Sequence, residues 1–228
     1  MHRQGGLVDG HGRAQARRLG CIDFRQSRFL ISGEPAVCAR ALGQPMRNFQ
    51  LLAAGSNVVP LLNAVMRQPD LWNQNKLRTT HPQSPHTQVD DIWLRFNALP
   101  EPGREADVVD EHESINYPAM FDLPQARPLI FGLMTMVEGE RLGRVLITRL
   151  APGKRIDPHV DGGSHAEYYD RYHVVLNSAP GSLFHCGDET VQMRTGECWW
   201  FDNSVTHSVE NNSAEDRIHM IVDVRTTR

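Results

Sequence analysis

The chain has 228 residues and a formal net charge of -3 at pH 7, from 24 Lys and Arg against 27 Asp and Glu. This length allows one domain with a sizeable core, and the small charge gives no strong attraction to nucleic acid or to an anionic membrane. Because no apolar run reaches the roughly 18 residues of a membrane span, we expect neither a nucleic-acid partner nor a membrane partner.

The four cysteines indicate a reducing compartment. Cys21, Cys38, Cys186 and Cys198 form no C-x-x-C pair, and they are too sparse for a disulfide framework. The first 20 residues contain no apolar segment of the kind found in a secretory signal. We therefore expect a cytoplasmic protein.

Residues 1–45 differ from the rest of the chain. They are rich in Arg and lack hydrophobic periodicity, which predicts a poorly ordered N-terminal extension. A basic interaction arm and an organelle-targeting segment are the alternatives. The folded domain is predicted to span residues 46–228.

The pattern in the middle of the chain predicts two helices and one strand. Residues 58–68 suit a helix that ends before Pro69, and residues 128–137 are apolar enough for a second helix. Residues 92–96 alternate like a half-buried strand. Residues 78–90 and 99–114 are polar and rich in Pro or Gly, and we interpret them as loops.

The last third of the chain predicts mainly β structure. Short candidate strands follow one another there, separated by pairs of turn residues such as Gly162-Gly163 and Pro180-Gly181. They cover residues 144–150, 158–161, 171–177, 182–186, 190–194, 197–201, 205–210 and 217–224. Eight short strands at this spacing favour a sandwich or barrel, of which the jelly roll is the eight-stranded form.

Two histidines and an aspartate in this region form a candidate metal site. His159 and Asp161 make an H-x-D pair, which is a weak signal alone, but residues two apart on a strand share a face. His207 lies 46 residues after Asp161, on another predicted strand. Two His and one carboxylate on one side of a metal form the facial triad of non-heme iron(II) oxygenases.

Arg217 is a candidate for binding a carboxylate co-substrate. It begins the final predicted strand, ten residues after His207. A guanidinium binds a carboxylate through two parallel hydrogen bonds, which suits the distal carboxylate of 2-oxoglutarate. Without the preceding histidine, a surface salt bridge would be the simpler interpretation.

These motifs resemble the aspartyl/asparaginyl β-hydroxylase family of 2-oxoglutarate and iron(II)-dependent oxygenases. The matching run extends from Ile147 to Val224 and contains ITRLAPGKRIDPHVD, RYHVVLN and GECWWFDNSVTHSVENNSAEDR. The resemblance implies a double-stranded β-helix core of the jelly-roll or cupin type, at about residues 130–228, preceded by N-terminal helices.

The resemblance also implies the cofactors and a role for each site residue. Iron(II), 2-oxoglutarate and dioxygen would be required. His159, Asp161 and His207 would be the catalytic metal ligands, and the other members would contact 2-oxoglutarate: Arg217 and Thr148 near its distal carboxylate, Arg171 and His173 near the carboxylate that chelates the metal. A histidine that only fills the barrel interior is the alternative for His173.

The implied activity is that of a dioxygenase that hydroxylates an amino-acid side chain, of the Asp or Asn type, in a peptide or protein. The best-known animal aspartyl hydroxylases have glycine at the position of Asp161, whereas the full triad is more similar to bacterial amino-acid and proline hydroxylases. A free amino acid or another small molecule is therefore an alternative substrate, and a non-catalytic cupin-like binding protein is a further alternative. The oligomeric state is not indicated.

Two polar segments are candidates for substrate binding. Residues 78–91 and 162–170 are predicted loops at the mouth of the barrel, and loops on a rigid scaffold commonly carry recognition. We expect Arg78 and Glu167 to contact substrate. The glycines after Asp161 favour a lid that closes over the site.

Overall fold

The computed structural model describes residues 46–81, 84–98 and 112–227. These residues belong to one unit, Gln44–Arg228, and the description below concerns that unit alone. The predicted poorly ordered extension at residues 1–45 lies outside the described residues, as does most of the loop predicted at residues 99–114.

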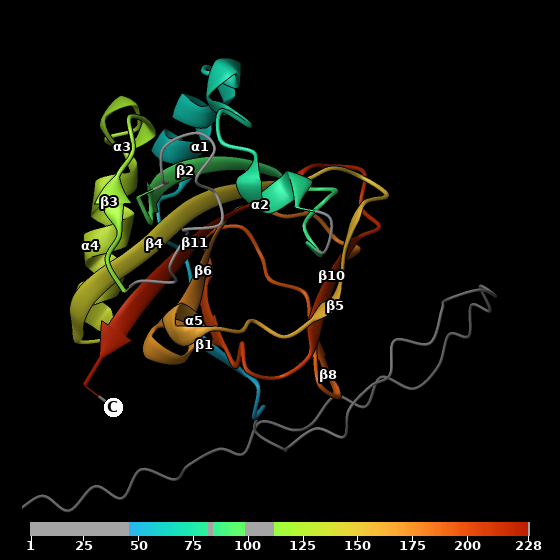
Figure 1. The fold of residues 1–228 in the computed structure, drawn as a ribbon. Coiled ribbons are helices and arrows are strands. Elements are labelled where there is room, and N and C mark those ends of the chain that lie inside the picture. The colour runs from blue at the N-terminus through green and yellow to red at the C-terminus, as the bar shows by residue number, and fades with distance from the viewer. Residues whose placement is uncertain (1–45, 82–83, 99–111, 228) are drawn as a thin grey trace, which may run out of the picture. The chain divides into compact units, whose positions relative to one another are not determined.

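The described residues form two antiparallel sheets (Figure 1). The seven-stranded sheet, here the major sheet, has the order β1 (Phe49–Ala53), β9 (Cys198–Phe201), β6 (Asp170–Asn177), β11 (Arg217–Thr226), β4 (Gly139–Leu150), β2 (Asp90–Phe96) and β3 (Ile115–Asn116). The four-stranded sheet, here the minor sheet, has the order β5 (Arg155–His159), β10 (His207–Asn211), β7 (Ser182–Cys186) and β8 (Glu189–Val191).

The mainly β architecture predicted from the sequence is confirmed, because the strands form two antiparallel sheets. The major sheet also includes three strands that precede residue 130, namely β1, β2 and β3, and β2 agrees with the strand predicted at residues 92–96. β2 pairs with β4 along the opposite side from β11, and β1 pairs with β9 at the other edge. These pairings join residues far apart in the chain, so hydrophobic periodicity within each segment could not reveal them.

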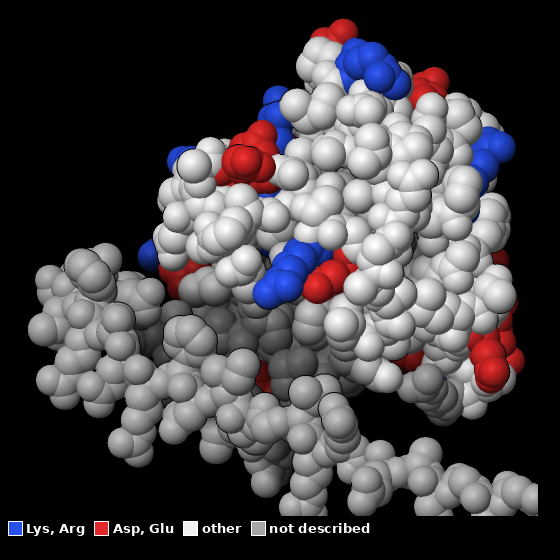
Figure 2. Space-filling view, turned by 180° about the vertical axis from the view of Figure 1, so that it is seen from behind, with Lys and Arg blue, Asp and Glu red and all other residues white. Residues whose placement is uncertain are grey.

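Charged side chains of both signs are spread over the face of the molecule seen in Figure 2. On that face the described Lys and Arg side chains lie among Asp and Glu side chains rather than in one patch. Within residues 46–81, 84–98 and 112–227, no helix is long and apolar enough to cross a membrane.

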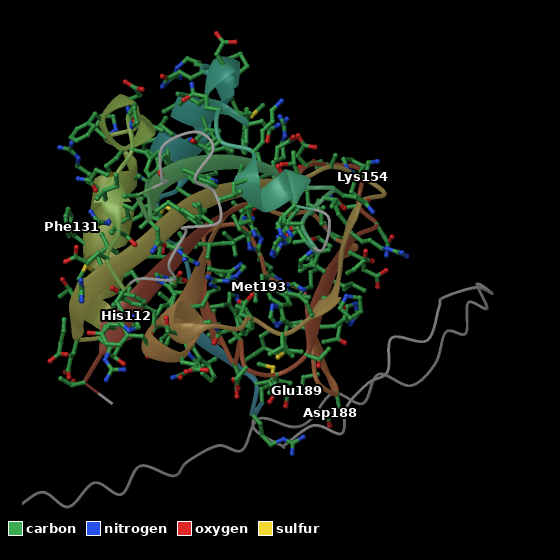
Figure 3. The ribbon with its side chains drawn as sticks, in the orientation of Figure 1. His112, Phe131, Lys154, Asp188, Glu189 and Met193 are labelled. Carbon is green, nitrogen blue, oxygen red and sulfur yellow. The ribbon has the colours of Figure 1, made fainter. Side chains whose placement is uncertain are left out.

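The two ends of the minor sheet can be located by labelled charged residues. Lys154 marks one end, and the turn of Asp188 and Glu189 marks the other (Figure 3). The cross-strand partners His159 and His207 lie at the end marked by Glu189. The carboxylate of Glu189 accepts backbone N–H groups of residues 47 and 48 at 2.9 Å each, which ties the start of the domain to this end.

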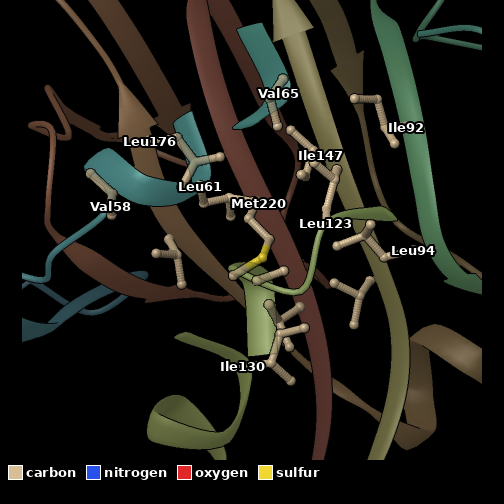
Figure 4. Close-up of a cluster of buried hydrophobic side chains, with 14 of the residues drawn as sticks. Val58, Leu61, Val65, Ile92, Leu94, Leu123, Ile130, Ile147, Leu176 and Met220 are labelled. Atoms are coloured by element: carbon tan, nitrogen blue, oxygen red, sulfur yellow. The ribbon is translucent and has the colours of Figure 1, made fainter. Parts of the chain in front are cut away.

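Helices cover the outer face of the major sheet (Figures 1 and 4). They are α1 (Val59–Met66), the 3-10 helix η1 (Pro69–Leu71), α3 (Ala119–Asp122) and α4 (Ala126–Met136). Figure 3 shows Phe131 on the outer side of α4. The core beneath includes Leu61 and Ile130 from the helices and Ile147 and Met220 from the sheet. Burying each such side chain stabilises the fold by about 1.5–3 kcal/mol.

The alternation of side chains along β11 separates this apolar core from the space between the sheets. Ile218, Met220, Val222 and Val224 belong to the outer core. The residues that alternate with these four along β11 therefore point the opposite way, toward the minor sheet. Because that set includes Arg217, His219 and Asp223, the inner face of β11 is polar although it is buried.

Both predicted substrate loops contain a short helix. α2 (Leu77–Thr80) precedes the polar turn before β2, and α5 (Ser164–Tyr168) lies between the H-x-D motif and β6. The lid segment is thus less open than its two glycines suggested, because His165 of α5 is buried.

Candidate functional site

The three predicted metal ligands come together between the two sheets. His159 ends β5 and His207 begins β10, and these two residues are direct cross-strand partners with ring centroids 4.2 Å apart. Asp161 follows two residues after His159, where its backbone N–H donates to the carbonyl of Asn203 at 3.1 Å. One ligand atom from each residue lies within 4.8 Å of the others.

The orientation of both imidazoles suits metal binding. His159 Nδ1 lies 2.8 Å from the carbonyl oxygen of Asp157, and His207 Nδ1 lies 2.9 Å from that of Val205. A carbonyl only accepts, so each Nδ1 carries the proton and each Nε2 offers a lone pair. The Nε2 atoms lie 3.6 and 3.9 Å from oxygens of Asp161, distances that two ligands of one ion can have.

The electrostatics of His207 agree with a neutral ligand. Burial lowers the pKa of its imidazole, and the nearby carboxylate of Asp161 offsets only part of that shift. The ring therefore keeps its lone pair at neutral pH. Two imidazoles and one carboxylate are a donor set that fits a divalent first-row metal ion.

Arg171 links Asp161 to a second buried carboxylate. Its Nη1 donates to Asp161 Oδ2 at 2.5 Å. Its Nε donates to Oδ1 of Asp223 at 2.8 Å, and its Nη2 donates to Oδ2 of Asp223 at 3.0 Å. Burial alone would lower the pKa of the guanidinium, but the two carboxylates outweigh burial and raise it. Burial would likewise raise the pKa of Asp223, but Arg171 and His165 lower it. Both groups are therefore charged.

Arg217 is buried without a carboxylate. Among the described residues, its guanidinium donates to Nδ1 of His219 at 3.1 Å and lies over the ring of Phe184, and no acidic side chain is within ion-pair distance. Burial lowers the pKa of Arg217 to about 9, so the group remains mainly protonated at neutral pH. A buried cation without an anionic partner is costly.

His173 and His219 form a neutral pair beside Arg217. Their Nδ1 atoms are 3.1 Å apart. Burial, followed by the charge of Arg217, lowers the pKa of both rings well below 6.5. Thr148 lies opposite His219 on β4 and is also buried. The structure thus brings all the co-substrate candidates to one interior face.

Arg78 and His86 also reach this site, from the segment before β2. The ring of His86 packs edge-on against His159 at 5.0 Å. Burial lowers the pKa of His86, and the charge of Arg78 lowers it further. Arg78 is held by the buried carboxylate of Asp91 through two hydrogen bonds of 2.9 Å.

A cavity of about 30 Å³ lies at the centre of these residues. It is lined by Arg78, His86, Thr148, Ile156, His159, Asp161, Arg171, His173, Phe184, Phe201, His207, Val209, Arg217 and Ile221. Glu167 does not line it. That side chain is exposed and borders a separate groove of about 450 Å³, so the expectation that Glu167 contacts substrate at the metal is not supported.

Sequence reasoning missed several members of the site. His219 and Asp223 could have been found, because they lie two and six residues after Arg217 on a predicted strand and therefore share its face. His165 and His86 carried no comparable signal. They lie in segments without strand periodicity, and their positions depend on tertiary packing.

The family model for aspartyl/asparaginyl β-hydroxylases matches residues 65–227. The chain belongs to this family. Membership confirms the resemblance seen in the sequence.

Individual relatives add detail on similarity. An L-proline cis-4-hydroxylase of Rhizobium meliloti (strain 1021) is 29% identical over 126 residues. The match covers 54% of this chain but only 44% of the relative, so the chain spans less than half the length of that enzyme.

Solved structures support the fold. The epimerase SnoN, in a complex with Fe³⁺, α-ketoglutarate and nogalamycin RO, matches with a TM-score of 0.53 and 13% identity, over 78% of this chain and 79% of that chain. A second SnoN structure gives a TM-score of 0.52 with 14% identity, over 78% of each chain. At this identity the likeness establishes the architecture alone.

Proposed function

We propose that the protein is an iron(II)- and 2-oxoglutarate-dependent dioxygenase that hydroxylates an amino-acid side chain. The observation that carries this proposal is the buried cation Arg217, which has no carboxylate partner among the described residues and lines the same cavity as His159, Asp161 and His207. Family membership and the His-Asp-His cluster support iron(II) and 2-oxoglutarate as the cofactors.

His159, Asp161 and His207 would hold the iron. When bound, iron(II), 2-oxoglutarate and dioxygen would supply the oxidising chemistry that converts a substrate C–H bond into C–OH, with succinate and carbon dioxide as the other products. The carbonyls of Asp157 and Val205 keep the two imidazoles in the tautomer and orientation that the metal requires.

Arg217 would bind the distal carboxylate of 2-oxoglutarate through a two-pronged pair of hydrogen bonds. Thr148, opposite His219 on the adjacent strand, would add a hydroxyl hydrogen bond to the same carboxylate. Arg171, which donates to Asp161, and His173 also line the cavity and would contact the other end of the co-substrate. Phe184 beneath Arg217 supplies an apolar wall that excludes water.

Two kinds of substrate are candidates. The family description supports an aspartyl or asparaginyl residue in a peptide or protein. A free amino acid is the second candidate, because the curated relative acts on L-proline by its name. Arg78 and His86 line the cavity and are the side chains that we expect to contact either substrate.

A product screen tests this proposal. Protein with iron(II), 2-oxoglutarate and ascorbate would be incubated with Asp- and Asn-containing peptides and with free amino acids, and products would be analysed by mass spectrometry. We expect succinate release and a product heavier by one oxygen atom. The proposal would be refuted if 2-oxoglutarate were not turned over with any of the substrates and were not turned over without substrate either.

The role of Arg78 in substrate binding can be separated from co-substrate binding. Arg78→Gln should slow hydroxylation while leaving substrate-independent succinate formation nearly intact. Glu167→Gln is the matched control, since Glu167 does not line the cavity. A parallel loss of both activities in Arg78→Gln would assign Arg78 to the fold or to the co-substrate.

We also propose that the catalytic domain comprises residues 46–228 and that the protein works in the cytoplasm. The described cysteines, Cys186 and Cys198, are buried free thiols. Burial raises the pKa of Cys186 to about 11 and that of Cys198 to about 12, so both remain protonated and unreactive. This agrees with a reducing compartment, in which ferrous iron is maintained.

A further inference from the structure

A continuous line of buried polar groups leads from the metal ligand Asp161 to helix α5. Arg171 Nη1 donates to Asp161 Oδ2, Arg171 Nε and Nη2 donate to Asp223, and Asp223 Oδ2 lies 3.0 Å from His165 Nε2. Asp223 and His165 are each only 1% exposed. Neither of them lines the cavity, so direct contact with substrate does not account for them.

The two oxygens of Asp223 fix the plane of the guanidinium. Oδ1 accepts from Nε, and Oδ2 accepts from Nη2 and from the ring of His165. An ionised carboxylate only accepts, so His165 must present an N–H at Nε2. Because both oxygens are engaged, Arg171 cannot rotate without leaving a buried charge unpaired, and its Nη1 stays aimed at Asp161.

The same arrangement determines which oxygen of Asp161 is free. Oδ2 accepts the hydrogen bond from Nη1 and lies 3.9 Å from Nε2 of His207, whereas Oδ1 lies 3.6 Å from Nε2 of His159. A carboxylate held in this way offers one oxygen to a metal in a defined direction. Hydrogen-bond partners behind metal ligands commonly set ligand orientation and metal affinity.

We propose that Asp223 and His165 are positioning residues of the metal site, which act through Arg171 to orient the carboxylate of Asp161 and to fasten helix α5 beside it. The inference rests on the proposed function, because it takes His159, Asp161 and His207 as the metal site. It goes beyond that function by assigning a task to two residues that contact neither metal nor co-substrate.

The opposing explanation is that Arg171 and Asp223 are only a structural cross-strand ion pair. The chain contains a comparable pair for reference. Arg149 and Asp90 are direct partners on β4 and β2, with Nε and Nη2 of the arginine 3.0 and 2.7 Å from one carboxylate oxygen. This pair is more exposed, and neither residue lines the metal cavity.

The test compares metal binding by full-length variants in the absence of co-substrate and substrate. Wild type, Asp223→Asn and the control Asp90→Asn would be titrated with Mn²⁺, and their Co²⁺ complexes would be compared by visible absorption. Asp223→Asn keeps the shape but leaves the charge of Arg171 balanced by Asp161 alone, beside the incoming cation. We expect its Mn²⁺ affinity to fall by about 10- to 100-fold and its Co²⁺ spectrum to change.

His165 supplies a second, milder test. His165→Phe keeps a ring but removes the donor to Asp223, and it should weaken Mn²⁺ binding by a smaller factor. His165→Gln restores an N–H donor and should recover much of the affinity. If Asp223→Asn does not fold, the comparison between His165→Phe and His165→Gln decides the matter.

The outcomes separate the two proposals. Wild-type binding of Mn²⁺, with affinities of Asp223→Asn and His165→Phe equal to that of Asp90→Asn and unchanged Co²⁺ spectra, would overturn the positioning role. Failure of the wild type itself to bind Mn²⁺ would instead contradict the proposed function.

Discussion

The two faces of strand β11 show how one segment serves both stability and chemistry. Its outward residues, such as Met220 and Val222, pack under the helices in an entirely apolar core. Its inward residues Arg217, His219 and Asp223 are equally buried but polar. Burial therefore does not distinguish the two faces. The difference is that the inward groups are hydrogen-bonded to other polar side chains: Asp223 to Arg171 and His165, and Arg217 to His219.

The largest effect is expected at the metal ligands. Replacing His207 by Ala removes one of the three donors, and we expect turnover to fall below detection. The fold should persist, because His207 belongs to no apolar core cluster. Succinate formation and circular dichroism measure the two properties. Substantial turnover by His207→Ala would show that the metal is held elsewhere.

The second-largest effect is expected on the KM for 2-oxoglutarate when Arg217, on the inward face of β11, is replaced. Arg217→Met removes the cation that would pair with 2-oxoglutarate, and losing one partner of a buried charge pair costs about 2–5 kcal/mol. The KM for 2-oxoglutarate should rise by about 30-fold or more. Arg217→Lys keeps the charge without the two-pronged geometry and should fall between Met and wild type.

Arg217→Met also tests whether the inward face of β11 contributes to the stability of the fold. Without co-substrate the guanidinium is a buried cation with no carboxylate partner among the described residues, so its replacement should not lower the free energy of unfolding. Urea denaturation of the metal-free protein measures this. A marked destabilisation would mean that Arg217 supports the fold rather than the co-substrate.

A substitution on the outward face of β11 should lower the stability of the fold and leave the KM for 2-oxoglutarate unchanged, which is the opposite of the result expected for Arg217→Met. Met220 is fully buried in the outer core, and Met220→Ala should lower the free energy of unfolding by about 2–5 kcal/mol. The KM for 2-oxoglutarate of the folded protein should remain close to that of the wild type. A large rise in KM would show that the two faces are not independent.

The smallest effect is a pH dependence of stability that arises from His219. Burial, and then the charge of Arg217, lowers its pKa well below the ordinary 6.5, so the folded ring stays neutral where the unfolded ring binds a proton. The contribution to stability is complete above pH 6.5 and is lost as the pH falls toward the folded pKa. The expected slope is at most about 1.4 kcal/mol per pH unit.

His219→Gln tests this slope. Urea denaturation of the metal-free wild type and variant, between about pH 7.5 and about pH 5.5, should show that the variant loses less stability on acidification. Equal losses in both proteins would indicate that His219 is protonated in the folded state.

The sequence predicted the mainly β fold and the residues that converge between the two sheets, but not how every strand is paired. The spacing of His159, Asp161, His207 and Arg217 carries ligand chemistry directly, and period-two alternation places such residues on shared faces. The same alternation, applied to the residues after Arg217, would also have found His219 and Asp223. The contacts of His86 with His159 and of Arg78 with Asp91 come from a segment without periodicity. They depend on how β2 docks against β4, which no local pattern encodes.

Binding of 2-oxoglutarate to the Mn²⁺-loaded protein, measured by calorimetry without oxygen, tests the central claim most directly. The account predicts one site per chain, strongly weakened in Arg217→Met and retained in Met220→Ala, because only the inward face of β11 meets the co-substrate. Absence of binding by the wild type, or equal binding by wild type and Arg217→Met, would contradict it.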